Sequence, residues 1–335
     1  MEVTLKDIAK ATGFSVNTVS RALRDDRAIS QKTKDIIKSK ANELNYIPNA
    51  LASSMRSMHS GLIGVISADS TNPFFGEVIK GIEERATNFG YQLMLGCTEE
   101  SIEKEEKLIK MFLSRRLDGL IIMPVFDNSE EHIEMFKRLS RSVPFVFAGR
   151  YLEGLREHSI LHQDFTGQKY VFDYLFSKGH KNILYIAGPE NVSNSGERIK
   201  GMLESYEKNN VQFLPEYMKV STGRIEDGYT IVNQALNRGL EFTAVACFND
   251  MIAMGAMKSL AENDLKVPED VEVFGYDNLF LSQFFQPSLS TVDVPRFKLG
   301  QRSMEVLDLM IKKKDVSKIC ETELPIRLVF RGSTR

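Results

Sequence analysis

The spacing of apolar residues at the start of the chain predicts a short helix followed by a tight turn. Thr4 can cap this helix, whose apolar residues Leu5, Ile8 and Ala9 recur at the interval of a helical turn. Gly13 then supplies the left-handed conformation that ends such a helix. The turn at Gly13 therefore leads directly into a second helical element.

The second helix is predicted to follow Ser15, which can cap it, and to bury Val16, Val19 and Leu23. Its opposite face then carries polar donors and no carboxylate: Asn17, Ser20, Arg21 and Arg24. In the major groove of DNA, Asn can pair with adenine and Arg with guanine, each good pair giving roughly 1–3 kcal/mol of discrimination. The pattern fits a DNA-reading helix, and also two packed surface helices with a solvated polar side.

A third predicted helix favours the DNA-reading interpretation. Ser30 can cap a run in which Ile36, Ile37, Ala41 and Leu44 form an apolar stripe. Three capped helices are enough to build the minimal core of a helix-turn-helix unit.

From residue 60 onward, short apolar runs alternate with amphipathic stretches, which predicts βαβ units with buried parallel strands. The predicted strands are 62–66, 91–95, 119–123, 144–147, 183–186, 244–247 and 271–274. The predicted helices are 75–88, 102–114, 130–139, 170–177, 197–209, 229–236 and 251–261. The alternation restarts near residue 170, so we expect two α/β lobes with a ligand cleft at the carboxyl ends of their strands.

Charge divides the chain in the same place. Residues 1–60 carry a net charge of about +4, whereas the whole chain of 335 residues carries −2 and the remainder about −6. A basic head on an acidic body is typical of a nucleic-acid-binding module attached to another domain. Because one such head makes few phosphate contacts, we expect a homodimer on a pseudo-palindromic double-stranded DNA site.

The composition argues against several other classes of protein. The N-terminus is polar and the sequence has no run of 18 apolar residues, so we expect a cytoplasmic protein that does not enter a membrane. Cys97, Cys247 and Cys320 lie far apart, which fits reduced thiols better than a disulfide or a zinc site.

Motifs for enzymatic chemistry are also lacking, because the sequence has no GxGxxG after a strand, no GxxxxGK[ST] and no HExxH. His158 and His162 lie four residues apart near Asp164, a spacing that could bind a metal on a helix. The intervening Ser-Ile-Leu is more typical of a strand edge, which we prefer. We therefore expect neither an enzyme nor a cofactor.

Two segments, Thr4 to Arg21 and Tyr46 to Arg56, resemble the lactose/galactose repressor (LacI/GalR) family of bacterial transcription regulators. The resemblance continues to the terminal Arg331-Gly332-Ser333-Thr334. It implies an α/β fold class in which a helix-turn-helix DNA-binding domain precedes a two-lobed, periplasmic-binding-protein-like (Rossmann-like) effector domain. The implied boundaries are a head at 1–45, a linker and hinge helix at 46–60, a first lobe at about 61–160 plus 291–322, and a second lobe at about 161–290 plus 323–335.

In this family the hinge helix folds on DNA and inserts an apolar side chain into the minor groove. The position usually occupied by Leu is Met55 here, a more flexible side chain of similar volume. An ordinary linker is the alternative interpretation of this short segment. Together, the resemblance and the polar face predict DNA contacts from Thr4, Leu5, Ser15, Val16, Asn17, Thr18, Ser20, Arg21, Arg24, Asn49, Ala52 and Met55.

The resemblance also implies an effector site between the lobes. An arginine fork and a carboxylate can hold neighbouring hydroxyl groups of a sugar. The alternatives without a binding function are a surface salt bridge for the arginine and a turn position for the carboxylate. The residues at family effector positions are Phe74, Phe75, Arg198, Asn249 and Asp277.

Two departures from the family bear on the effector. Gly223 stands where many relatives place an aromatic ring against the ligand, and Gly149 replaces an acid that commonly precedes the position of Arg150. The pocket is therefore either larger, or filled by another residue. We expect a small polar effector, with a sugar or sugar derivative as the preferred class.

The predicted function is sequence-specific repression of transcription, with operator affinity controlled by an effector that changes the relative orientation of the lobes. One alternative is a regulator controlled by a protein co-regulator. A solute-binding protein would share the two-lobed body but should lack the first sixty residues.

Overall fold

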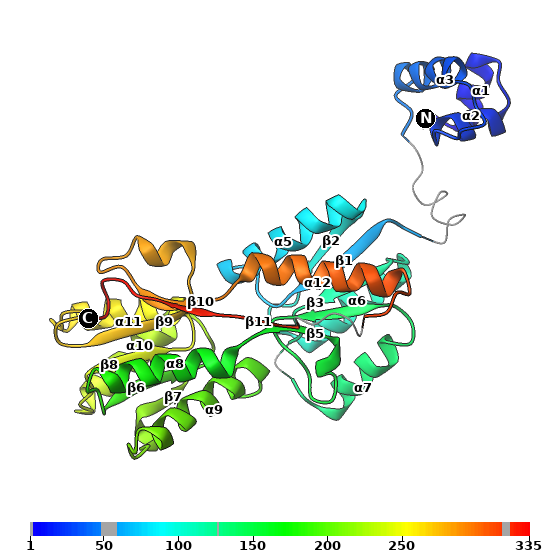
Figure 1. The fold of residues 1–335 in the computed structure, drawn as a ribbon. Helices are drawn as coiled ribbons and strands as arrows, with labels where there is room; N and C mark the ends of the chain where they lie inside the picture. Colours follow the sequence, from blue (N-terminus) through cyan, green and yellow to red (C-terminus); the bar gives the residue numbers. More distant parts are fainter. Residues whose placement is uncertain (1–2, 48–58, 126, 317–321) are drawn as a thin grey trace. The chain divides into compact units, whose positions relative to one another are not determined.

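The computed structural model describes residues 3–47, 59–125, 127–316 and 322–335. The chain divides into two compact units, Met1–Ser60 and Gly61–Arg335, which are considered separately (Figure 1). Among the described residues, no helix has the length and apolar character needed to span a bilayer.

The smaller unit is a three-helix head formed by α1 (Leu5–Thr12), α2 (Val16–Leu23) and α3 (Gln31–Glu43). Gly13 ends α1 with φ 73°, and the hydroxyl of Ser15 accepts a hydrogen bond from the Thr18 amide at 3.1 Å, as these residue types predict. The buried apolar side chains of the head are Ile8, Ala9, Val19, Ala22, Ile37 and Ala41.

Two side chains predicted in this core are exposed instead. Val16, the first residue of α2, is 42% exposed, although Val19 and Ala22, one and two turns later on the same face, are buried. Ile36 is 44% exposed because it lies about 100° around the helix from the buried Ile37.

The first lobe of the larger unit contains a parallel sheet in the order β11-β5-β4-β3-β1-β2. Its strands are β1 (Leu62–Ser67), β2 (Gln92–Cys97), β3 (Gly119–Ile122), β4 (Phe145–Ala148), β5 (Ser159–His162) and β11 (Glu323–Leu324). Its helices are α5 (Pro73–Phe89), α6 (Ile102–Ser114), α7 (Glu130–Leu139) and α12 (Arg296–Ile311). Helices α5 and α12 pack on one face of the sheet, and α6 and α7 pack on the other (Figure 1).

The second lobe repeats this winding in the order β12-β10-β9-β8-β6-β7, with only β12 antiparallel to its neighbour among the described strands. Its strands are β6 (Ile183–Ala187), β7 (Met218–Val220), β8 (Ala244–Cys247), β9 (Glu272–Asp277), β10 (Ser290–Asp293) and β12 (Arg327–Val329). Its helices are α8 (Asp164–Ser177), α9 (Ser193–Lys208), α10 (Ile225–Asn237) and α11 (Asp250–Glu262). Single-turn 3₁₀ segments are η2 (Pro215–Tyr217) and η3 (Phe280–Gln283) in this lobe and η1 (Arg156–His158) between β4 and β5 of the first lobe.

Glycines allow paired helices to touch through their backbones. A Cβ on Gly81 of α5 would lie 2.1 Å from the carbonyl oxygen of Phe297, and one on Gly300 of α12 would lie 2.0 Å from that of Val78. Such distances are shorter than any ordinary contact, so the close packing of α5 on α12 requires glycine at both positions.

The chain crosses between the lobes three times. Strand β5 pairs with β4 in the first sheet, and α8 then begins in the second lobe at Asp164. Strand β10 stays in the second sheet through Asp293, α12 then packs on α5 in the first lobe, and β11 keeps the chain in the first sheet through Leu324. The crossings therefore lie slightly later than 161, 291 and 323, because each strand keeps its pairing to its last residue.

Candidate DNA-binding face and interlobe cavity

The polar face of α2 is accessible, as its spacing predicts. Asn17 and Arg24 are exposed, and Thr18, Ser20 and Arg21 are partly exposed. The exposure of Val16 adds an apolar group to this face, which suits its predicted contact with DNA better than burial would.

The helix itself carries no carboxylate on this face, but the turn that follows it places one against Arg21. The Nε atom of Arg21 lies 2.8 Å from Oδ2 of Asp26, which follows the helix in sequence but returns to its side. This hydrogen bond raises the pKa of Arg21 and lowers that of Asp26. Arg21 therefore has a solvent-accessible partner that DNA would have to replace.

The remaining predicted DNA contacts have local structural roles or lie outside the described residues. Thr4 precedes α1 and donates its amide and hydroxyl hydrogens to the carboxylate of Asp7, at 2.8 and 2.7 Å. Leu5 is partly buried against the core of the head. The predicted hinge contacts, Asn49, Ala52 and Met55, fall outside the described residues.

In the larger unit, the five predicted effector residues lie around one small cavity of about 40 Å³. This volume is little more than that of one water molecule in the liquid. The cavity wall contains residues of both lobes, including Phe74, Phe75, Arg198, Asn249 and Asp277. The fold thus gathers side chains that are about 200 residues apart in sequence.

Arg198, on α9, is not the surface residue of the alternative interpretation, because it is only 1% exposed. Its Nε donates to Asp164 at 2.7 Å, and its Nη1 donates to the carbonyl oxygen of Phe248. Its guanidinium carbon lies 3.5 Å from the ring centre of Tyr276 and 4.5 Å from that of Phe248. These contacts fix the guanidinium at the cavity wall.

Asp277 ends β9 opposite this arginine, with Oδ1 4.0 Å from Nη2 of Arg198. Burial raises the pKa of Asp277 to about 8, with the charge of Arg198 opposing the shift. The raised pKa favours the protonated carboxyl, which can donate as well as accept a hydrogen bond. This differs from the acceptor-only carboxylate that the sequence predicts.

Asn249 also has a structural role. Its side-chain oxygen accepts the Ile252 amide at 2.8 Å and so caps α11, while its Nδ2 donates to the carbonyl oxygen of Gly223 at 2.9 Å. The cap therefore ties the start of α11 to the loop where many relatives place an aromatic ring.

A larger cavity of about 640 Å³ lies beside the small one and shares Asn72, Phe75, Arg150, Phe248 and Asn249 with it. Gly223 lines this larger cavity, and the nearest atom to a Cβ built there is Nδ2 of Asn249 at 3.7 Å. The space of the missing aromatic ring is therefore open, which supports the larger-pocket alternative over replacement by another ring.

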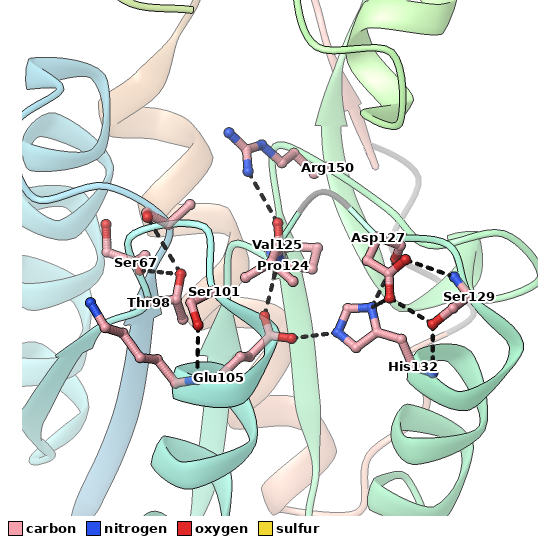
Figure 2. A network of polar contacts seen from close by, with 12 residues as sticks. Ser67, Thr98, Ser101, Glu105, Pro124, Val125, Asp127, Ser129, His132 and Arg150 are labelled. Carbon is pink, nitrogen blue, oxygen red and sulfur yellow. Dashed lines mark hydrogen bonds and ion pairs between the residues drawn. The ribbon is translucent and has the colours of Figure 1, made fainter. Parts of the chain in front are cut away.

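Sequence reasoning missed Arg150 as a member of the cavity wall, although it lies next to the departure at Gly149. Its Nη1 donates to Glu100 at 3.0 Å and to the Pro124 carbonyl at 3.1 Å, and it lies over the ring of Phe75. Figure 2 shows the contact with Pro124. Its position two residues after the buried strand β4 was the available signal.

The histidines weighed as metal ligands belong to other environments. His158 stacks on Phe145 with ring centres 4.7 Å apart, whereas His162 is buried with Nε2 3.2 Å from Oδ1 of Asp164. No group of three or more potential metal ligands occurs among the described residues.

Comparison with known proteins identifies the family. The family model of bacterial regulatory proteins, lacI family, matches residues 4–49, and that of periplasmic binding proteins and sugar binding domain of LacI family matches residues 60–330. The chain belongs to the LacI family. The resemblance, the α/β fold class with its helix-turn-helix head, and the prediction of a non-enzymatic regulator are thereby confirmed.

Individual relatives are similar over nearly their whole length. The HTH-type transcriptional repressor PurR of Pasteurella multocida is 30% identical, covering 99% of this chain and 98% of PurR. The HTH-type transcriptional repressor CytR of Escherichia coli K12 is 31% identical, and the alignment covers 99% of this chain and 96% of CytR. The lac repressor dimer bound to operator and the anti-inducer ONPF has a TM-score of 0.90 at 28% identity, covering 100% and 99%. This chain is accordingly a DNA-binding transcriptional repressor.

Proposed function

We propose that this repressor acts as a cytoplasmic homodimer whose operator affinity is controlled by a sugar or sugar derivative bound between the lobes. The observation that carries the proposal is the gathering of Phe74, Phe75, Arg198, Asn249 and Asp277 around one cavity that adjoins a larger one. Arg198 supplies hydrogen-bond donors, and a protonated Asp277 supplies both a donor and an acceptor. Hydroxyl groups of a sugar can satisfy both.

The adjoining cavity supports an effector larger than a monosaccharide ring alone, because about 640 Å³ lies within the range of small-molecule sites. The description of the matching family model as a sugar binding domain supports the same class. The presence of the head favours this function over the solute-binding alternative, which should lack those residues.

An exposed apolar patch on the second lobe supports the homodimer. Phe280 and Phe284 are 68% and 64% exposed, with ring centres 5.0 Å apart, and Leu281 lies between them in sequence. Patches of this kind mark interaction surfaces. A second copy is the favoured occupant, since the lac repressor structure to which this chain is similar is a dimer.

The test has two stages. A thermal-shift screen with D-ribose, D-galactose, cellobiose and common nucleosides would identify a ligand, and an operator selected from random duplex DNA would then be titrated with and without it. We expect a change in operator affinity of roughly 5- to 150-fold, the usual range of allosteric coupling. Ligands that stabilise the protein without changing operator affinity, or no stabilising ligand at all, would favour the protein co-regulator alternative.

A further inference from the structure

A buried ionic pair in the first lobe has no role in the function proposed above. Glu105 on α6 and His132 on α7 have side chains that are 0% and 1% exposed, and Oε2 of Glu105 lies 2.5 Å from Nε2 of His132. Figure 2 shows the two side chains pointing toward each other beneath the loop that follows β3. An unpaired charge would be costly at this depth, so each of the two groups can be charged only because the other lies beside it.

The hydrogen bonds of the imidazole ring determine its protonation. Nδ1 of His132 lies 2.8 Å from the carbonyl oxygen of Asp127, and a carbonyl oxygen can only accept, so Nδ1 carries a hydrogen. In a neutral ring Nε2 would then present a lone pair to the carboxylate of Glu105, which also only accepts. The contact is favourable only when a second proton lies between these two groups.

The charged groups around the ring favour the imidazolium form. Burial lowers the pKa of His132, but the hydrogen bond and charge of Glu105, with smaller contributions from Asp127, raise it overall. The Asp127 carboxylate lies 3.9 Å from Nδ1. On the far side of the loop, the guanidinium of Arg150 is paired with Glu100 at 3.0 Å.

The pair also fastens the loop between β3 and α7. Oε1 of Glu105 accepts a hydrogen bond from the Val125 amide at 3.1 Å, and Nδ1 of His132 donates one to the Asp127 carbonyl oxygen. The pair therefore binds the loop backbone at two residues. The preceding carbonyl, of Pro124, accepts from Arg150 at the cavity wall. Figure 2 shows these contacts in sequence from Arg150 through Val125 to His132.

The same loop reaches the second lobe. Asn128 donates from Nδ2 to the carbonyl oxygen of Asn191 at 3.4 Å, and its side-chain oxygen accepts the Glu153 amide at 3.2 Å. A group that fixes this loop therefore affects the position of Arg150 and the contact between the two lobes.

We propose that Glu105 and His132 form a carboxylate–imidazolium pair at neutral pH, and that this pair is the positioning element that holds the β3–α7 loop against Arg150 and the second lobe. The inference does not depend on the identity of an effector or on operator binding. Removal of the shared proton leaves two acceptors facing each other and releases the loop.

The decisive variant is Glu105→Gln. A glutamine can accept the Val125 amide with its oxygen and donate its amide hydrogen to a neutral Nε2 of His132, so it preserves both contacts without the extra proton. Glu131→Gln, at an exposed position on the same α7 as His132, removes one negative charge without touching the pair and is the matched control.

The first measurement is the unfolding equilibrium as a function of pH. The pKa of His132 is raised above its ordinary value of 6.5, so the pair stabilises the fold fully below that pH and loses its effect as pH rises through the folded-state pKa. For one proton the loss approaches tenfold in the unfolding equilibrium constant per pH unit. We expect stability to fall more steeply above pH 6.5 in the native chain and in Glu131→Gln than in Glu105→Gln, which keeps only the contributions of other groups such as Asp277; equal slopes in all three would overturn the proposal.

The second measurement is ¹⁵N NMR of the His132 ring, which requires no variant to fold. We expect both ring nitrogens to be protonated at pH 7 in the native chain. An unprotonated Nε2 at that pH would overturn the assignment.

Hydrogen exchange of the Val125 amide should also become at least tenfold faster in Glu105→Ala and remain slow in Glu105→Gln. Equal protection in both variants would count against the role of the pair in holding the loop.

Discussion

Two arginines, one in the head and one in the body, serve predicted binding sites in opposite ways. Arg21 is 39% exposed and, within the described part of the chain, forms an ion pair with Asp26, which is also exposed. Arg198 is 2% exposed by side chain and contacts Asp164, the Phe248 carbonyl and two aromatic rings. The first can exchange its partner for a nucleic acid at little cost, whereas the second is already desolvated and fixed.

The difference shows what each site requires. A surface ion pair in water contributes little and is readily replaced, which suits a group that must meet DNA only at its operator. A guanidinium held between rings and hydrogen-bond acceptors is oriented before a ligand arrives, which reduces the ordering cost of binding a small molecule. Removing the two arginines should therefore have different consequences.

The largest expected effect is that of Arg198→Met, because it takes the guanidinium away from the buried Asp164, which then keeps only its contact with His162. We expect the body to lose about 3–5 kcal/mol of unfolding free energy, as when one member of a buried ion pair is removed. Urea denaturation of Arg198→Met and of Arg21→Met measures the contrast. Similar stability in the two variants would show that the burial of Arg198 has no energetic weight.

The next effect concerns Asp277, whose pKa is raised to about 8 by burial. A carboxyl that binds its proton more tightly in the folded state stabilises the fold fully below the unfolded-state pKa, near 3.8, and loses that effect as pH rises through 8. Asp277→Asn should therefore flatten the fall in stability between pH 4 and 8, a fall of at most roughly tenfold per pH unit in the equilibrium constant. Melting curves across this range, with the exposed Asp270→Asn as control, provide the check.

A smaller effect, confined to DNA, is expected for Arg21→Ala. Loss of one bidentate base contact should reduce the preference for operator over random DNA roughly 10- to 100-fold. The melting temperature should remain that of the native chain. Retained preference in a competition gel shift would remove Arg21 from the set of residues that read the operator.

The smallest effect is expected for Asp26→Asn, which frees Arg21 and removes a negative charge near DNA. Affinity for random duplex DNA should rise, within about fivefold at low salt, since exposed ion pairs are weak. The gain should disappear at high salt, where such charges are screened. A loss of affinity would instead mean that Asp26 orients Arg21 for its contact.

The sequence predicts helices, caps and turns well wherever residues close in sequence determine them. The cap at Ser15, the left-handed Gly13 and the helix at Ile102–Ser114 follow from residue types and spacing alone. The apolar pattern places the start of α8 near residue 170, but the helix begins at Asp164. The pattern misses the first turns because they contain buried polar groups such as Gln168.

The candidate cavity was predictable in its members but less so in its chemistry. Family motifs identify Arg198 and Asp277, yet neither the stacking of Tyr276 on Arg198 nor the raised pKa of Asp277 follows from spacing. Both depend on burial by segments distant in sequence. Arg150 was overlooked for the same reason, since its partners Glu100 and Pro124 come from other loops.

By itself, the sequence determined the order of helices and strands, the basic head and the family, because these depend on short-range periodicity, on capping and on motifs that remain readable along the chain. Only the tertiary structure decided that Asp26 pairs with Arg21, that Gly223 leaves open space, and that Glu105 faces His132. Those outcomes depend on contacts across the fold and on loss of water around charged groups, which change the chemistry of a side chain without changing its place in the sequence.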